Sequence, residues 1–161
     1  MQNETKPTKQ NSVEIIIEGF TFGRKYFVLA DSSIAERIND KYYELNRFSF
    51  DNRPYVELFC NEVGYRLFSI AKIVSDAFLK DEFGRWLIPK DGDLENCNSS
   101  NLEWVMKKEH YSGIEKGICF YKRDSNTLEL SKEQVARRKL YLKEYKERYE
   151  KKKADVFYYS P

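Results

Sequence analysis

The sequence lacks the paired cysteines and clustered histidines that build common zinc sites. It contains one histidine, His110, and three cysteines, Cys60, Cys97 and Cys119, which lie far apart in the chain. No two of them form a Cys-x-x-Cys pair, so a structural zinc knuckle is not expected. Isolated cysteines of this kind favour free thiols, as in proteins of a reducing compartment.

Long apolar runs are also missing. No stretch approaches the roughly 18 apolar residues that a membrane-spanning helix needs. Met1–Ser12 is polar and lacks the apolar core of a signal peptide. We therefore expect no membrane partner. The expected location is the cytoplasm or the inside of an assembly formed there, such as a virion or a ribonucleoprotein.

Neither charge sign is in large excess, because the net charge is only +2. The positive charges are nevertheless unevenly distributed along the chain. Between Lys132 and Lys153 there are ten Lys or Arg residues against four Glu. Aromatic residues are plentiful and 41% of the chain is hydrophobic, which argues against general disorder. A length of 161 residues fits one main domain with appendages.

Short strands and a few helices are the regular elements that the pattern predicts, so the expected fold class is α+β. Ser69–Lys80 is predicted as a helix, because its apolar residues recur at helical spacing and Ser69 can cap it. A further helix is predicted to begin near Lys107. Runs of β-branched and aromatic residues predict the strands, at 13–17, 26–30, 42–50, 55–60, 85–88, 102–106 and 118–121.

The last predicted element is a long basic helix from Ser131 to about Lys153. Ser131 and Gln134 form a capping box at its start. Val135, Leu142 and Tyr149 are spaced seven apart, which gives only a narrow apolar stripe. We expect this helix to project or to dock on the rest of the chain rather than to form a core.

Two sequence blocks in the middle of the chain carry a family resemblance. Asp91-Gly92 and Asn101-Leu-Glu-Trp-Val105 are similar, with the same spacing, to the N-H-x-D-G-N and N-L-E-W-V blocks of HNH homing endonucleases. Ile70–Phe78 resembles the helix before these blocks. Gly19-Phe and 26–37 resemble the DNA-binding module that precedes such nucleases, and 130–141 resembles a segment that follows them. The resemblance implies a ββα unit and phage or mobile-element ancestry. Together with the composition along the chain, it divides the sequence into five segments, at 1–12 (flexible tail), 13–60 (β-rich module), 61–117 (HNH-like module), 118–130 (connection) and 131–161 (basic helix and aromatic terminus).

The working residues of the family are replaced at two adjacent positions. The resemblance places the general-base histidine at Pro89 and a metal ligand at Ile88. Proline has no titratable group and isoleucine offers a metal no side-chain donor. The bracing asparagine is kept as Asn101, beside Asp91 of the turn, and the second metal ligand falls on His110, which is chemically acceptable there. The resemblance therefore implies a degenerate site, which takes Mg²⁺ or Mn²⁺ only if it still works.

Three functions stay open at this point. The first is association with DNA or RNA without cleavage, with phosphate contacts predicted from the basic helix at Arg137, Arg138, Lys139, Lys143 and Lys146. The second is a structural component of a virion or ribonucleoprotein, in which the nuclease fold is a packing unit. The third is an active nuclease with an altered site.

Overall fold

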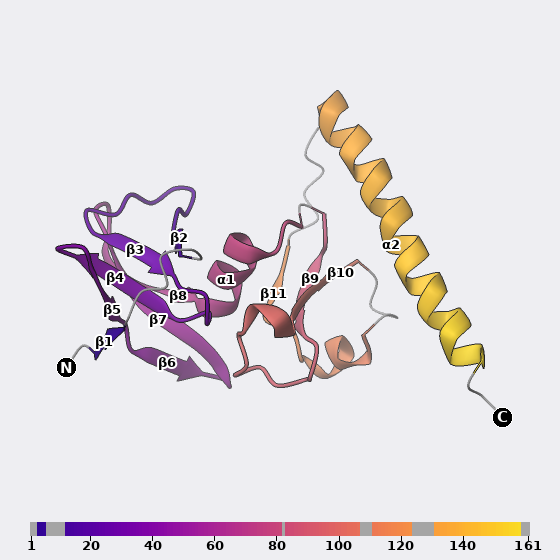
Figure 1. Cartoon of the computed structure of the whole chain (residues 1–161), viewed down its shortest axis with the longest axis horizontal. Helices are drawn as coiled ribbons and strands as arrows, with labels where there is room; N and C mark the ends of the chain where they lie inside the picture. Colours follow the sequence, from indigo (N-terminus) through magenta and orange to yellow (C-terminus); the bar gives the residue numbers. More distant parts are fainter. Residues whose placement is uncertain (1–2, 6–11, 82, 107–110, 124–130, 159–161) are drawn as a thin grey trace.

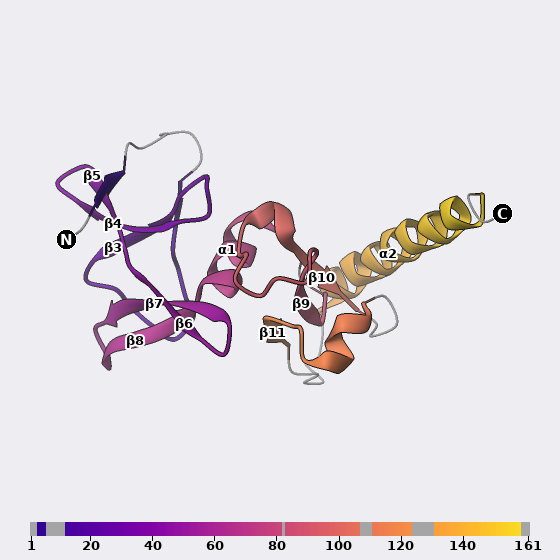
Figure 2. The same cartoon turned by 90° about the horizontal axis from the view of Figure 1, so that it is seen from below.

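A computed structural model describes residues 3–5, 12–81, 83–106, 111–123 and 131–158 of the chain. Antiparallel strands dominate the N-terminal half, and helix α1 (Ile70–Phe78) lies between this part and a smaller sheet (Figures 1 and 2). Helix α2 (Lys132–Tyr158) runs along the far side of the smaller sheet (Figure 1). The described residues therefore form a small mixed α/β fold with antiparallel sheets and two α-helices.

The N-terminal half contains two antiparallel sheets. One has the order β1-β5-β4-β3-β2 and the other the order β6-β7-β8. Their strands are β1 (Asn3–Thr5), β2 (Val13–Glu14), β3 (Lys25–Val28), β4 (Ile34–Ile38), β5 (Lys41–Glu44), β6 (Arg47–Phe50), β7 (Arg53–Cys60) and β8 (Gly64–Ser69). The pair β7–β8 crosses residue 60, where the sequence analysis divides the chain, and that division stays a prediction.

Tight turns explain how these strands reverse direction. Asp51 and Asn52 both have positive φ, 53° and 61°, and join β6 to β7. Asn39 and Asp40 do the same between β4 and β5, with φ of 50° and 62°. Asn and Asp tolerate this backbone region best among residues with a Cβ, and the resulting turn matches the twist of a hairpin.

Several sequence predictions about the strands were wrong. The segment 42–50 is not one strand, because the chain leaves the first sheet after β5 and enters the second at β6. The break falls after Leu45, whose N–H still donates to the Ile34 carbonyl oxygen in register with the β4–β5 ladder (2.9 Å). The strands β4 and β8 were not predicted, and Asn3–Thr5 of the expected flexible tail pair with β5. The strand expected at 13–17 is regular only at Val13–Glu14.

Helix α1 confirms the helical spacing seen in the sequence. The Ser69 side chain accepts a hydrogen bond from the Lys72 N–H, so the predicted N-cap is present. Ile70, Ile73 and Val74 are buried in the main core, together with residues of both N-terminal sheets and of the smaller sheet. Burying each of these aliphatic side chains contributes about 2 kcal/mol, which fixes α1 as the centre of the fold.

The smaller sheet has the order β10-β9-β11. Its strands are β9 (Trp86–Pro89), β10 (Leu102–Val105) and β11 (Tyr121–Lys122). A short 3-10 helix, Ser99–Asn101, leads into β10, and another, Ser112–Lys116, ends at Gly117 in the left-handed region. The helix predicted from Lys107 is thus 3-10 over 112–116, while 107–110 lie outside the described residues.

Helix α2 docks on the free edge of β10. The Tyr141 hydroxyl donates to the Asp81 carboxylate (2.9 Å), and the Met106 N–H donates to the Tyr145 hydroxyl (3.0 Å). The capping box is confirmed, because the Ser131 and Gln134 side chains each accept the other residue's N–H. An open strand edge can pair with other chains and cause aggregation. The docked helix covers part of the open edge of β10.

The docking contact of Tyr141 predicts a pH dependence of stability. Burial raises the pKa of the Tyr141 hydroxyl, and the negative charge of Asp81 raises it further. The folded state therefore holds this proton more tightly than the unfolded chain, in which tyrosine ionises near about pH 10. The stabilisation is complete below about pH 10 and is lost as the pH rises above it.

Tyr141→Phe tests this dependence. Its free energy of unfolding is expected to be about 1 kcal/mol lower at neutral pH and to fall less steeply as the pH rises above about 10. Urea unfolding followed by circular dichroism measures both quantities. Burial also raises the pKa of Tyr26 and Tyr111, so some alkaline slope should remain. An unchanged slope in the variant would show that Tyr141 titrates as in the unfolded chain.

Two further predictions concern the thiols and the membrane. Cys60, Cys97 and Cys119 are free, and the first two are buried, as expected for isolated cysteines. In the part of the chain that the structure describes, no helix has the length and apolar character to cross a membrane.

Candidate nucleic-acid interface

The hairpin β9–β10 carries both of the blocks that the sequence analysis singled out. Pro89 pairs with Leu102 and Ile88 pairs with Glu103 across the antiparallel ladder. The connecting loop runs from Lys90 to Asn101, so Asp91-Gly92 lie at its start and the second block begins at its end. Trp104 is buried and donates from its indole N–H to the Ser75 hydroxyl of α1 (3.0 Å), which ties the hairpin to the core.

Asn101 braces the loop of this hairpin. Its side-chain oxygen accepts the Asp91 N–H (3.0 Å), and its side-chain nitrogen donates to the Asp91 carboxylate (3.0 Å) and to the Asn96 carbonyl oxygen (2.9 Å). The residue is 7% exposed, so water does not compete for these bonds. One side chain thus joins the start and the end of the loop.

Asp91 is engaged by the loop itself. Its carboxylate accepts the Asp93 N–H (2.8 Å) and the Asn96 side-chain amide (3.0 Å). The bond from the Asp93 backbone, followed by that from Asn96, lowers the pKa of the Asp91 carboxyl. Gly92 lies at the centre of this Asx turn with a φ of 78°, a conformation that glycine adopts without strain. Asp91 therefore acts in the turn.

Ile88 lies in an apolar cluster rather than in a polar site. Its side chain is 2% exposed and packs with Trp86 and Val105, with Tyr111, Ile114 and Cys119 around them. Pro89, the position that the resemblance gives to the general base, is fully buried. Neither side chain can hold a metal ion or take a proton at this place.

The donor set therefore does not fit a divalent metal as far as the structure describes it. Ile88 offers no ligand atom, and the Asp91 carboxylate is already bonded within the loop. Within the described ranges, no group of three or more His, Cys, Asp or Glu residues is placed to hold a metal. His110, the remaining candidate ligand, lies outside the described residues, so its assignment stays a prediction.

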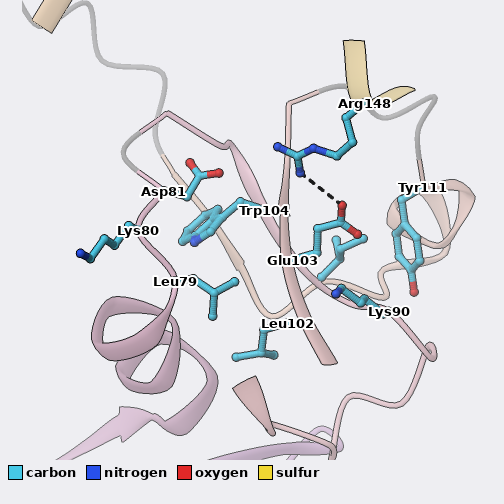
Figure 3. Close-up of a pocket in the computed structure, with 10 residues that line it drawn as sticks. Leu79, Lys80, Asp81, Lys90, Leu102, Glu103, Trp104, Tyr111 and Arg148 are labelled. Atoms are coloured by element: carbon cyan, nitrogen blue, oxygen red, sulfur yellow. Dashed lines mark ion pairs between the residues drawn. The ribbon is translucent and has the colours of Figure 1, made fainter. Parts of the chain in front are cut away.

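A cleft of about 660 Å³ lies beside the hairpin, next to Ile88 (Figure 3). Three cationic side chains, Lys80, Lys90 and Arg148, line it together with two carboxylates. Asp81 accepts from Tyr141, and Glu103 pairs with Arg148 at 3.7 Å, as the dashed line in Figure 3 marks. The cleft therefore has one more cation than anions, and its lining residues are Leu79, Lys80, Asp81, Ile88, Lys90, Leu102, Glu103, Trp104, Tyr111 and Arg148.

Most of this cleft could not be predicted from the sequence. Lys80, Lys90 and Arg148 are far apart in the chain and show no motif. They meet only because α2 docks over β10, which depends on the polar contacts of Tyr141 and Tyr145. The docking tyrosines lie four residues apart, which places them on the same side of a helix. This spacing was visible in the sequence, but two tyrosines do not form the apolar stripe that predicts a buried helix face.

The five residues predicted to contact phosphates are all exposed on α2, but they do not share one face. Lys139, Lys143 and Lys146 lie four and three residues apart, so they form one stripe along the helix. At about 100° per residue, this stripe is turned well away from the docked residue Tyr145. Arg138 lies near the docked side, and Arg137 lies on another flank. The structure thus places three of the five residues predicted to contact phosphates on one stripe of α2.

One solved structure allows a comparison with a known protein. The chain is similar to the HNH homing endonuclease I-HmuI, whose structure describes DNA binding and cleavage by that enzyme. The TM-score is 0.50 with 24% identity, and the match covers 78% of this chain and 64% of the endonuclease chain, less than two thirds of it. A scan against family models finds no match, and a search of curated proteins finds none. The likeness shows an HNH-like fold.

Proposed function

We propose that this chain is a nucleic-acid-binding derivative of an HNH homing endonuclease that does not cleave its ligand. The observation that carries the proposal is the burial of Ile88 and Pro89 in an otherwise well-braced hairpin. The bracing residue Asn101 retains its bonds, while the positions given to the metal ligand and the base are apolar. The chain thus keeps the residue that braces the hairpin, while the positions that would carry out cleavage in the family are apolar.

Duplex DNA is the ligand that we propose first, since the similar endonuclease binds DNA. Two groups of cations on this chain suit a phosphate backbone. One is the stripe Lys139, Lys143 and Lys146 on α2, and the other is the set Lys80, Lys90 and Arg148 at the cleft. We propose further that β9, β10 and the segment after them correspond to the ββα unit, and that the ancestry is phage or mobile-element.

An electrophoretic mobility shift assay tests the proposed binding. Labelled duplex DNA, with duplex RNA in a parallel lane, is incubated with the full chain across a salt series. If three to five phosphates are contacted, the logarithm of the affinity falls against the logarithm of salt with a slope of about −3 to −4.5. A shift of RNA alone would change the ligand class, and no shift of either at low salt would contradict the proposal.

A second candidate function is a structural component of a larger assembly. It is favoured by the exposed apolar side chains on the undocked part of α2, Leu140 and Leu142 among them. Such side chains gain burial only from a partner. Size-exclusion chromatography of material from its native source tests it. Elution as a free monomer of 19.2 kDa would count against this role.

A further inference from the structure

A second cleft of the molecule is apolar and lies on the opposite side of α1 from the hairpin loop. It has a volume of about 680 Å³ and runs between residues 13–18, the outer side of α1 and the end of β8. In Figure 1, β2 lies beside α1 at this place. We call this cleft the β2 groove. Neither the hairpin residues nor the basic stripe of α2 line it.

One wall of the β2 groove is a strand edge. The strand β2 is the last strand of its sheet, and the Ile15 N–H donates to the Tyr26 carbonyl oxygen of β3 (2.8 Å). Backbone groups alternate along a strand, so those of Glu14 point away from β3, and Ile16 follows just beyond the regular end of β2. Among the described strands, none pairs with β2 on that side.

The apolar surface along this edge is unusually exposed. The side chain of Ile16 is 84% exposed and that of Leu67 on β8 is 46% exposed, while Tyr121 stands at the far rim. Below them, Ile15 and Ile73 belong to the buried core. A ligand lying in the groove would therefore cover apolar side chains on both walls and at the floor.

The charges around the groove are mainly negative. Glu14, Glu18 and Asp76 line it, against one cation, Lys72. Lys72 pairs with Asp76 at 2.6 Å, so the two glutamates on the edge side carry the excess negative charge. A polyanion such as a nucleic acid is repelled by this surface, whereas a basic chain is attracted.

From these observations we propose that the β2 groove docks an extended segment of a partner protein, apolar in its middle and flanked by Lys or Arg. The segment would add a strand to β2, with main-chain bonds to Glu14 and Ile16 and apolar side chains against Leu67 and Ile73. A cation opposite Glu14 would complete the match. This inference concerns a protein partner and does not rest on the proposed nucleic-acid role.

Phage display tests which peptides bind the β2 groove. A library of random nine-residue peptides is selected with the full chain as bait. The expected result is enrichment of apolar peptides flanked by Lys or Arg. The affinity of the best selected peptide is then measured by fluorescence anisotropy. Methylation of the peptide's alternate amide nitrogens should weaken binding by at least about tenfold, because added strands bind through their main chain.

Two variants of the protein test whether the peptide binds in the β2 groove. Ile16→Lys should weaken binding by at least about tenfold, through lost apolar contact and a repulsive charge. Ile38→Lys, at the exposed end of β4, is the matched control and should leave the affinity unchanged. Because Ile16 is exposed, thermal melts should show both variants folded.

Several results would overturn the inference. They are the absence of enrichment, enrichment of acidic peptides, and equal effects of Ile16→Lys and Ile38→Lys. A concentration-dependent dimer in sedimentation that Ile16→Lys dissolves would assign the groove to a second copy and would also overturn it.

Discussion

Replacing Asn101 with alanine is expected to lower the free energy of unfolding by about 3 kcal/mol. The substitution removes three hydrogen bonds at once, two with Asp91 and one with Asn96. It also leaves the Asp91 N–H and the Asn96 carbonyl without their partner at part-buried positions, where unsatisfied groups add to the cost of the lost bonds. The loop between β9 and β10 should lose its fixed shape.

Urea unfolding followed by tryptophan fluorescence measures this effect, since Trp86 and Trp104 lie in the hairpin. The matched control is Asn98→Ala. Asn98 is exposed and its side chain accepts from the Ser100 N–H at the start of a short 3-10 helix. Its loss should cost about 1 kcal/mol. Equal destabilisation by both variants would mean that Asn101 does not brace the loop.

Reversing the charge of Lys139, Lys143 and Lys146 to glutamate is expected to weaken DNA binding by roughly a hundredfold at low salt. Each lost phosphate contact also reduces the salt slope by about 1, so the triple variant should bind with a slope smaller by about 3. The stripe is exposed and turned away from the docked tyrosines, so the fold should be kept. Filter binding across a salt series measures both quantities.

The control for this variant reverses three exposed lysines elsewhere. Lys25, Lys41 and Lys116 lie off the stripe, and changing them alters the net charge by the same amount. If phosphate contact at the stripe matters, the control should retain most of the affinity and the salt slope. An equal loss of affinity in both variants would mean that overall charge causes the effect. Unchanged affinity in both would mean that the stripe on α2 does not contact DNA.

The fold could be predicted from the sequence where one pattern dominates. The spacing of Ile70, Ile73 and Val74 predicted α1, because this helix buries one continuous face. The two strands of the hairpin β9–β10 were predicted at 85–88 and 102–106 on either side of a polar loop, and their pairing was implied by the family resemblance. By contrast, β8 presents exposed and half-buried side chains throughout, so its pairing with β7 shows no hydrophobic period. It forms because the backbone of β7 is available beside it.

The candidate site could be predicted in part, and for a similar reason. Ile88 and Pro89 were visible as replacements, since the resemblance assigns each position a role. The apolar packing around Ile88 was not visible, because Tyr111, Ile114 and Cys119 join it from a separate segment. The docking of α2 was left open, because its contacts are made by Tyr141 and Tyr145 through polar atoms. Polar contacts of this kind leave no apolar stripe in the sequence.

A single reaction tests most directly whether this HNH-like scaffold holds DNA without cutting it. End-labelled duplex DNA is incubated with the full chain in Mg²⁺ or Mn²⁺, and the same sample is run on native and denaturing gels. We predict a shifted complex on the native gel and intact strands on the denaturing gel. Cut strands that disappear with His110→Ala would contradict the account, because they would show that the altered site still works.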